Sequence, residues 1–131
     1  MGNDSNPSRF TPTIKLEHAD LRGEIYSIEL PDGHELMLIH STPGSFRGGH
    51  SHSCGERVLT LSGQMVYHVA DGSADHQWRV SSGEVVYHPA GQIHMGEFPE
   101  DTWLVEYKFA KKGEWSQENY GPYRERVNAS H

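Results

Sequence analysis

Four residues in the middle of the sequence are of types that bind metal ions together. His50 and His52 lie two positions apart, Glu56 comes four residues after His52, and His94 follows a later turn. Residues i and i+2 of an extended strand point to the same face, so the two imidazoles would converge on one point. Glu56 could add a carboxylate across the intervening bend, and His94 could add an imidazole from a neighbouring strand. Such a set suits Fe(II), Mn(II), Ni(II) or Zn(II), whereas Mg²⁺ and Ca²⁺ prefer oxygen ligands.

A His-x-His pair also has a second interpretation. Imidazole is the commonest metal ligand in proteins, but paired histidines also occur on surfaces and in cores without a metal. The chain has ten histidines in 131 residues, so the pair alone does not decide between the two interpretations. The surrounding pattern must decide.

The rest of the chain has the pattern of many short strands. From Ile14 onwards, apolar residues recur with the two-residue period of a β-strand. The main runs are Ile25–Leu30, Leu36–Ile39, Val58–Leu61, Met65–Val69, Trp78–Val80, Val85–Tyr87 and Trp103–Phe109. Turn-forming Gly, Pro, Asp and Ser residues separate the runs, and no good helical pattern precedes Lys111. This pattern predicts a β-sandwich or β-barrel.

Two spaced motifs around the histidines resemble those of the cupin superfamily. The first family motif is Gly, five residues, His-x-His, three or four residues, Glu, six residues and Gly. It matches Gly44, SFRGG, His50-Ser51-His52, SCG, Glu56, RVLTLS and Gly63. The second is Gly, five residues, Pro-x-Gly, two residues, His, three residues and Asn. It matches Gly83, EVVYH, Pro89-Ala90-Gly91, QI and His94, with Phe98 in place of the Asn. The glycines stand where tight turns between strands need positive φ or close backbone approach.

The resemblance implies an all-β fold, the double-stranded β-helix or cupin jelly-roll barrel. It also implies a metal ion in the mouth of the barrel, held by His50, His52, Glu56 and His94. The departure at Phe98 lies outside that ligand set and suggests a variant strand end or pocket wall.

We expect three segments along the chain. Residues 1–12 are a flexible N-terminal arm, 13–110 form the cupin β-barrel domain, and 111–131 are a polar C-terminal extension. The extension carries Trp115 and two tyrosines. It could therefore pack back as a lid, cross to a partner subunit or remain a frayed tail.

Further residues are candidates for the pocket wall. Aromatic residues on the predicted inner faces are Tyr67, Tyr87, Trp103 and Tyr107. Gln92 and Met95 flank His94, near the open coordination positions. Arg47 precedes His50 and could hold an anionic substrate through its planar guanidinium, or lie on the surface. The candidate catalytic residues are Tyr67, Tyr87, Gln92 and Arg47.

The remaining cysteine and histidines have weaker claims. Cys54 lies between the ligands, where a small residue in a bend is favoured over metal or redox chemistry. His40, His68 and His88 lie in or beside strands, where we expect hydrogen-bonded structural roles. One of them could act in acid–base chemistry or orient a ligand.

Composition excludes several classes of protein. A net charge of −7 argues against binding nucleic acid, whose phosphates require clustered Lys and Arg. The N-terminus lacks the apolar segment of a signal peptide, and no apolar run is long enough to span a membrane. A single cysteine cannot form an internal disulfide. We therefore expect a cytoplasmic protein that binds neither nucleic acid nor membranes.

These observations favour a metal-dependent enzyme that acts on a small polar or carboxylated molecule. Dioxygenase-like chemistry is the first expectation, with an isomerase or lyase next. The cofactor would be one divalent transition metal ion, Fe(II) or Mn(II) first and Ni(II) or Zn(II) as alternatives. The alternative function is a non-catalytic cupin that binds or senses a small molecule. We also expect a homodimer, because open sheet edges need to be covered.

Overall fold

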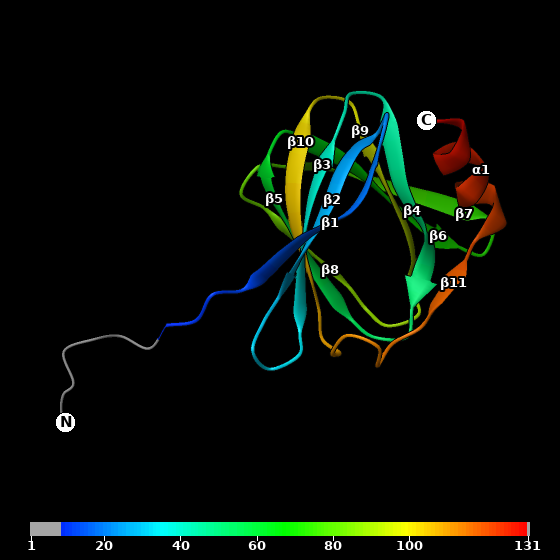
Figure 1. Cartoon of the computed structure of the whole chain (residues 1–131). Coiled ribbons are helices and arrows are strands. Elements are labelled where there is room, and N and C mark those ends of the chain that lie inside the picture. Colours follow the sequence, from blue (N-terminus) through cyan, green and yellow to red (C-terminus); the bar gives the residue numbers. More distant parts are fainter. Residues whose placement is uncertain (1–8, 131) are drawn as a thin grey trace.

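The computed structural model describes residues 9–130, which form two antiparallel β-sheets and one helix (Figure 1). The first sheet contains, in spatial order, β1 (Thr13–Asp20), β2 (Gly23–Glu29), β3 (Glu35–Ser41), β10 (Thr102–Lys108), β5 (Glu56–Ser62) and β8 (Val85–His88). The second contains β11 (Gln117–Asn119), β4 (Ser45–His52), β9 (Ile93–Phe98), β6 (Gln64–Asp71) and β7 (Ala74–Ser81). The two sheets curve around a shared interior, which confirms the predicted all-β jelly roll.

The interior between the sheets is filled by side chains that alternate along the strands. In β5, Val58 and Thr60 are buried while the flanking Arg57 and Leu61 are exposed. The apolar core consists of Ile39, Val58, Met65, Tyr67, Val80, Phe98 and Leu104. Burial of this apolar surface is the main term that holds the two sheets together. Phe98, at the position of the family's Asn, is one of these core residues.

The turn between β5 and β6 shows why one motif position must be glycine. Gly63 has φ +89°, and a Cβ there would lie 2.4 Å from both the Asp101 carbonyl and Thr102 Oγ1. Any larger residue would push β10 away from this turn. The motif glycine therefore lets this turn pack closely against the start of β10, at the end of β5 opposite Glu56.

The C-terminal segment packs back onto the second sheet. Strand β11 pairs with β4, and helix α1 (Gly121–Ala129) follows it on the outer side (Figure 1). Tyr123 and Val127 of α1 are buried against Met95, which forms a second, smaller apolar cluster. Pro122 lies in the first turn of the helix, where proline is favoured because no amide donor is needed there.

The structure does not describe residues 1–8, so most of the predicted arm lies outside the described part. Among the described residues, no helix is long and apolar enough to cross a membrane.

Candidate metal centre

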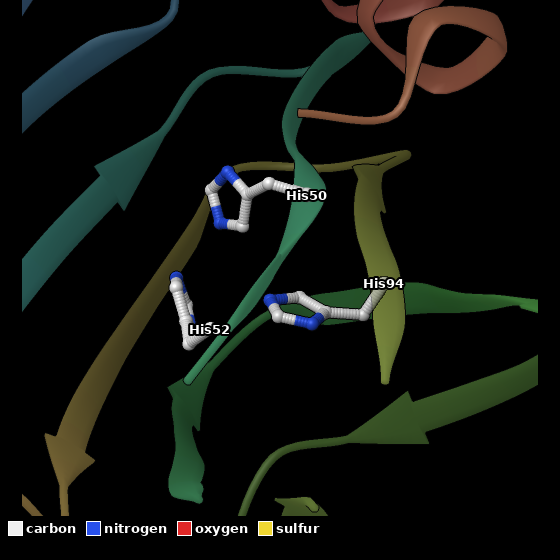
Figure 2. A group of neighbouring side chains, drawn as sticks. All are labelled: His50, His52 and His94. Atoms are coloured by element: carbon white, nitrogen blue, oxygen red, sulfur yellow. The ribbon is translucent and has the colours of Figure 1, made fainter. Parts of the chain in front are cut away.

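Three of the four predicted ligands converge inside the barrel. Figure 2 shows the rings of His50, His52 and His94 pointing toward one another. One ring nitrogen of each lies within 4.8 Å of the others. His50 and His52 come from the same strand, and His50 is the direct cross-strand partner of His94. The two-residue period of β4 and this register therefore create the cluster.

The donor atoms of this cluster are suited to a metal ion. His94 Nδ1 lies 3.0 Å from the Gln92 carbonyl and donates to it, which leaves Nε2 as the possible ligand atom. His50 Nδ1 and His52 Nδ1 are buried and have no hydrogen-bond partner among the described residues. A buried nitrogen without a partner is costly unless it binds a cation or a proton. The residues present therefore fit a transition metal ion.

The three imidazoles are also in the protonation state that binds metals. Burial lowers the pKa of His50 to about 2 and that of His52 to about 3, with neighbouring positive charge adding to both shifts. Burial also lowers the pKa of His94. All three rings are neutral near pH 7, so no proton has to leave before a metal binds.

Glu56, the fourth predicted ligand, lies beside the three histidines. Its carboxylate is fully buried, with Oε2 2.9 Å from Lys108 Nζ and 3.9 Å from His52 Nδ1. Oε1 lies 3.3 Å from His88 Nε2. Glu56, His88 and His94 form a second group of three whose donor atoms lie within 4.8 Å of one another. His94 thus belongs to two overlapping groups that together contain all four predicted ligands.

The sheet register explains the partners of Glu56. Lys108 of β10 and His88 of β8 are its direct cross-strand neighbours on either side. Three adjacent strands therefore place a lysine, a glutamate and a histidine in one row. Burial and then Glu106 raise the pKa of Glu56 to about 8, against the opposing effect of Lys108.

Among the candidate catalytic residues, Tyr67 and Gln92 join the site through a hydrogen-bond chain. The Tyr67 hydroxyl donates to Gln92 Oε1 at 2.7 Å and also contacts His88 Nδ1. The main-chain carbonyl of Gln92 accepts the bond from His94. For His88 we expected a hydrogen-bonded structural role, with acid–base chemistry or ligand orientation as the alternative. It is in contact with both Glu56 and Tyr67.

Three aromatic candidates lie away from the cavity that contains the site. Tyr87 is 55% exposed and packs beside Phe109. Trp103 stacks on His40, and Tyr107 stacks on His34. These three residues, which the sequence suggested for the inner face, do not line the cavity.

The alternate residues of β10 line the cavity instead, namely Leu104, Glu106 and Lys108. The apolar alternation of β10 predicted that the aromatic residues face the interior. In the structure, histidine rings cover this aromatic face, and charged residues of β10 face the interior of the barrel. Two charged residues next to the metal centre were therefore missed at the sequence level.

Arg47 lines the cavity at a distance from the cluster. Its Nε donates to Ser41 Oγ at 2.8 Å, and its Nη2 donates to the His40 carbonyl at 2.9 Å. Burial and then the nearby Arg22 lower its pKa to about 10. Met95 belongs to the cluster beneath α1, and Cys54 is half-buried in the bend.

His40 and His68 have the hydrogen-bonded roles expected for them. His40 contacts Glu24 and Asp101. His68 is fully buried between Asp75 and Glu97.

The cavity has a volume of about 370 Å³, which suits a small organic molecule. Its middle is apolar, with Ile39, Val58 and Met65 among the lining residues. Trp115 of the C-terminal extension lines the cavity beside the three histidines. The Trp115 ring packs against His52, with 5.2 Å between the ring centroids.

Comparison with solved structures identifies the same fold in proteins of low sequence identity. The capsular polysaccharide assembling protein CapF from Staphylococcus aureus matches with a TM-score of 0.68 and 22% identity over 86% of this chain. Vicilin from hazelnut, Corylus avellana, matches with 0.63 and 16% over 86%. A variant of oxalate decarboxylase from Bacillus subtilis matches with 0.58 and 20% over 82%.

This chain spans about a third of the length of each of these proteins, since it covers 33%, 35% and 30% of them. No protein-family model matches the sequence, and no curated protein is significantly similar to it. The matched structures have cupin domains. The chain therefore has the fold of the cupin superfamily.

Proposed function

We propose that this protein is a metal-dependent enzyme that acts on a small carboxylated molecule within the cupin barrel. The ligands would be His50, His52, Glu56 and His94, and the ion would be Fe(II) or Mn(II), with Ni(II) or Zn(II) as alternatives. The observation that supports this most directly is the convergence of three neutral imidazoles in the wall of the cavity. Dioxygenase-like chemistry is the first candidate, followed by isomerase or lyase chemistry.

The ion would supply a Lewis acid with one or two open positions for substrate oxygen atoms. The residues of the chain do the remaining work. Gln92 and Tyr67 hold the rings of His94 and His88 in place, and the apolar wall keeps water away from the reacting group.

The charge of the cavity supports an anionic substrate. The chain as a whole carries a net charge of −7, but the cavity wall has more basic than acidic side chains. Its basic residues are Arg22, Arg47, Lys108, Lys112 and Arg124, and its acidic residues are Glu35 and Glu106. A carboxylate would gain from this local excess of positive charge.

Metal binding is tested by titrating chelator-treated protein with Mn(II), Fe(II) and Zn(II) and measuring bound metal by elemental analysis. We expect one ion per chain and its loss in His94→Ala, because His94 belongs to both ligand groups. His76→Ala is the matched control, since His76 lies exposed on β7. Native protein that binds no transition metal would refute the proposal.

Catalysis is tested by oxygen uptake with a panel of small carboxylic acids and Fe(II)-loaded protein. Turnover that requires the metal and disappears in His50→Ala supports the enzyme. Ligand binding without turnover under any of the four metals would instead favour a binding or sensing protein.

We also propose a cytoplasmic homodimer. The support for the dimer is the first strand, β1, which is a sheet edge and exposes Ile14 and Leu16. The support for the compartment is the composition, with a single cysteine in the chain.

A further inference from the structure

Lys108 is a buried cation placed between two carboxylates at the metal end of the cavity. Its side chain is only 12% exposed, and its Nζ lies 2.9 Å from Glu56 Oε2 and 3.8 Å from Glu106 Oε1. The ammonium also lies over the Trp115 ring, 4.5 Å from the centroid. It therefore faces the cavity from a fixed position, held by three groups.

The charge balance around Lys108 changes when Glu56 becomes a metal ligand. Without a metal, the ammonium lies between the carboxyl groups of Glu56 and Glu106. With a divalent ion held by neutral imidazoles, the charges of the ion, Lys108, Glu56 and Glu106 sum to one net positive charge. A buried group of charges tolerates an excess charge poorly unless a counter-ion is present. When Glu56 coordinates the metal ion, Lys108 loses part of the negative charge of this partner. Lys108 is also the cation of this group that faces the cavity.

We propose that Lys108 is shared between Glu56 and a bound carboxylate. In metal-free protein it pairs with Glu56, and once Glu56 coordinates the metal it pairs with the carboxylate of the ligand. Metal and carboxylate then increase each other's affinity, because such coupling is reciprocal. This inference rests on the metal-binding function proposed above and adds the residue that selects the substrate class.

The proposal makes opposite predictions for the two ligands of the cavity. Lys108 repels the metal ion and competes with it for Glu56, so Lys108→Met should tighten metal binding. Loss of the lysine charge removes a repulsion that acts on any cation bound at Glu56. The repulsion removed is about twice as large for a divalent metal ion as for a competing proton, because the interaction scales with charge. The same substitution removes the cation that holds the ligand's carboxylate, so it should weaken anion binding.

The test measures both affinities by isothermal titration calorimetry. Mn(II) is titrated into chelator-treated protein, and benzoate is titrated into the protein with and without Mn(II). Benzamide, which has nearly the same shape as benzoate and no charge, is titrated in parallel. In native protein we expect Mn(II) to raise benzoate affinity about tenfold or more, with little change for benzamide.

In Lys108→Met we expect the Mn(II) affinity to rise about tenfold and the benzoate affinity of the Mn(II)-loaded protein to fall about tenfold. The matched control is Lys111→Met, since Lys111 is exposed and does not line the cavity. Both of its affinities should stay within about twofold of native. Lys108→Arg, which keeps the charge, should retain benzoate binding.

A Lys108→Met protein that weakens both Mn(II) and benzoate indicates a structural role and overturns the proposal. Unchanged benzoate affinity in that variant, or no benzoate binding by Mn(II)-loaded native protein, also overturns it. If native protein binds no Mn(II), the proposed metal function fails and this inference fails with it. If native protein binds Mn(II) but Lys108→Met does not shift the Mn(II) and benzoate affinities in opposite directions, this inference fails and the proposed metal function stands.

Discussion

Single residues set the chemical state of the candidate site, and Gln92 shows how. Its main-chain carbonyl holds the Nδ1 proton of His94, while its side chain accepts the Tyr67 hydroxyl that also contacts His88. One residue on the short connection between β8 and β9 therefore orients two imidazoles. The ring nitrogens left over face the buried space around Glu56.

The depressed histidine pKa values predict acid sensitivity in metal-free protein. The ordinary pKa of 6.5 falls to about 2 for His50 and His88 and to about 3 for His52, mainly through burial. The pKa of Glu56 rises from 4.5 to about 8. As pH falls from 6.5 to 4.5, the three histidines go from about half to almost fully protonated in the unfolded chain and stay neutral in the folded chain, which keeps one proton on Glu56. Unfolding therefore takes up about two protons, and acidification destabilises the fold.

We expect the free energy of unfolding to fall by on the order of 2 kcal/mol per pH unit as pH drops from 6.5 to 4.5. Above pH 6.5, Glu56 acts in the opposite direction, and its contribution is lost as pH rises towards 8. Urea denaturation of chelator-treated protein from pH 4.5 to 8 measures the stability change on both sides of pH 6.5. A stability that is flat or increasing on acidification below pH 6.5 would contradict the assignment of neutral, buried histidines.

At the scale of elements, the irregular part of β4 connects the metal centre to helix α1. Gly48 and Gly49 both have positive φ, at +91° and +83°, and the pairing with β9 shifts register between Gly48 and His50. Arg124 of α1 donates to the Gly48 carbonyl at 2.8 Å. The bulge thus aims His50 at the site and also provides the surface on which the helix docks.

Gly49→Ala should therefore loosen the helix. A Cβ at Gly49 would lie 3.0 Å from Arg124 Cδ and 3.2 Å from the Tyr123 carbonyl carbon. Gly72→Ala is the matched control, because Gly72 also has positive φ but faces open space. We expect about 1 kcal/mol of destabilisation for the control, from strain alone, and at least about 2 kcal/mol for Gly49→Ala. Hydrogen exchange over 117–129 should increase only in Gly49→Ala, and equal exchange in both variants would contradict the docking role.

At the scale of the whole molecule, the barrel separates two surfaces of different character. The cavity wall is rich in basic side chains although the chain is acidic overall. Strand β1 forms one edge of the first sheet, and nearly all of its residues are exposed. An apolar edge strand of this kind invites pairing with another chain.

Light scattering should give twice the chain mass of 14.8 kDa for the native protein. Leu16→Glu on β1 should shift it towards the mass of one chain, because a charge would be placed in the proposed contact. Leu61→Glu on β5 is the control and should leave the dimer intact. A native mass equal to one chain would refute the dimer.

The sequence by itself determined the class of fold and the shared face of His50 and His52. The two-residue period of a strand places His50 and His52 on one face whatever the rest of the chain does. The spaced glycines around them agree with tight turns, and Gly63 indeed has no room for a Cβ. These are local properties, and local properties can be inferred from residue order.

Only the tertiary structure decided which face of each strand is interior and which strands are neighbours. Alternation along β10 predicts two faces, but packing against β3 and β5 turned Glu106 and Lys108 inward and the aromatic residues outward. The row formed by Lys108, Glu56 and His88 joins strands distant in sequence, so no spacing in the chain reveals it. The local period of a strand is set by backbone geometry, whereas the partner of each residue is set by the register of the folded sheet.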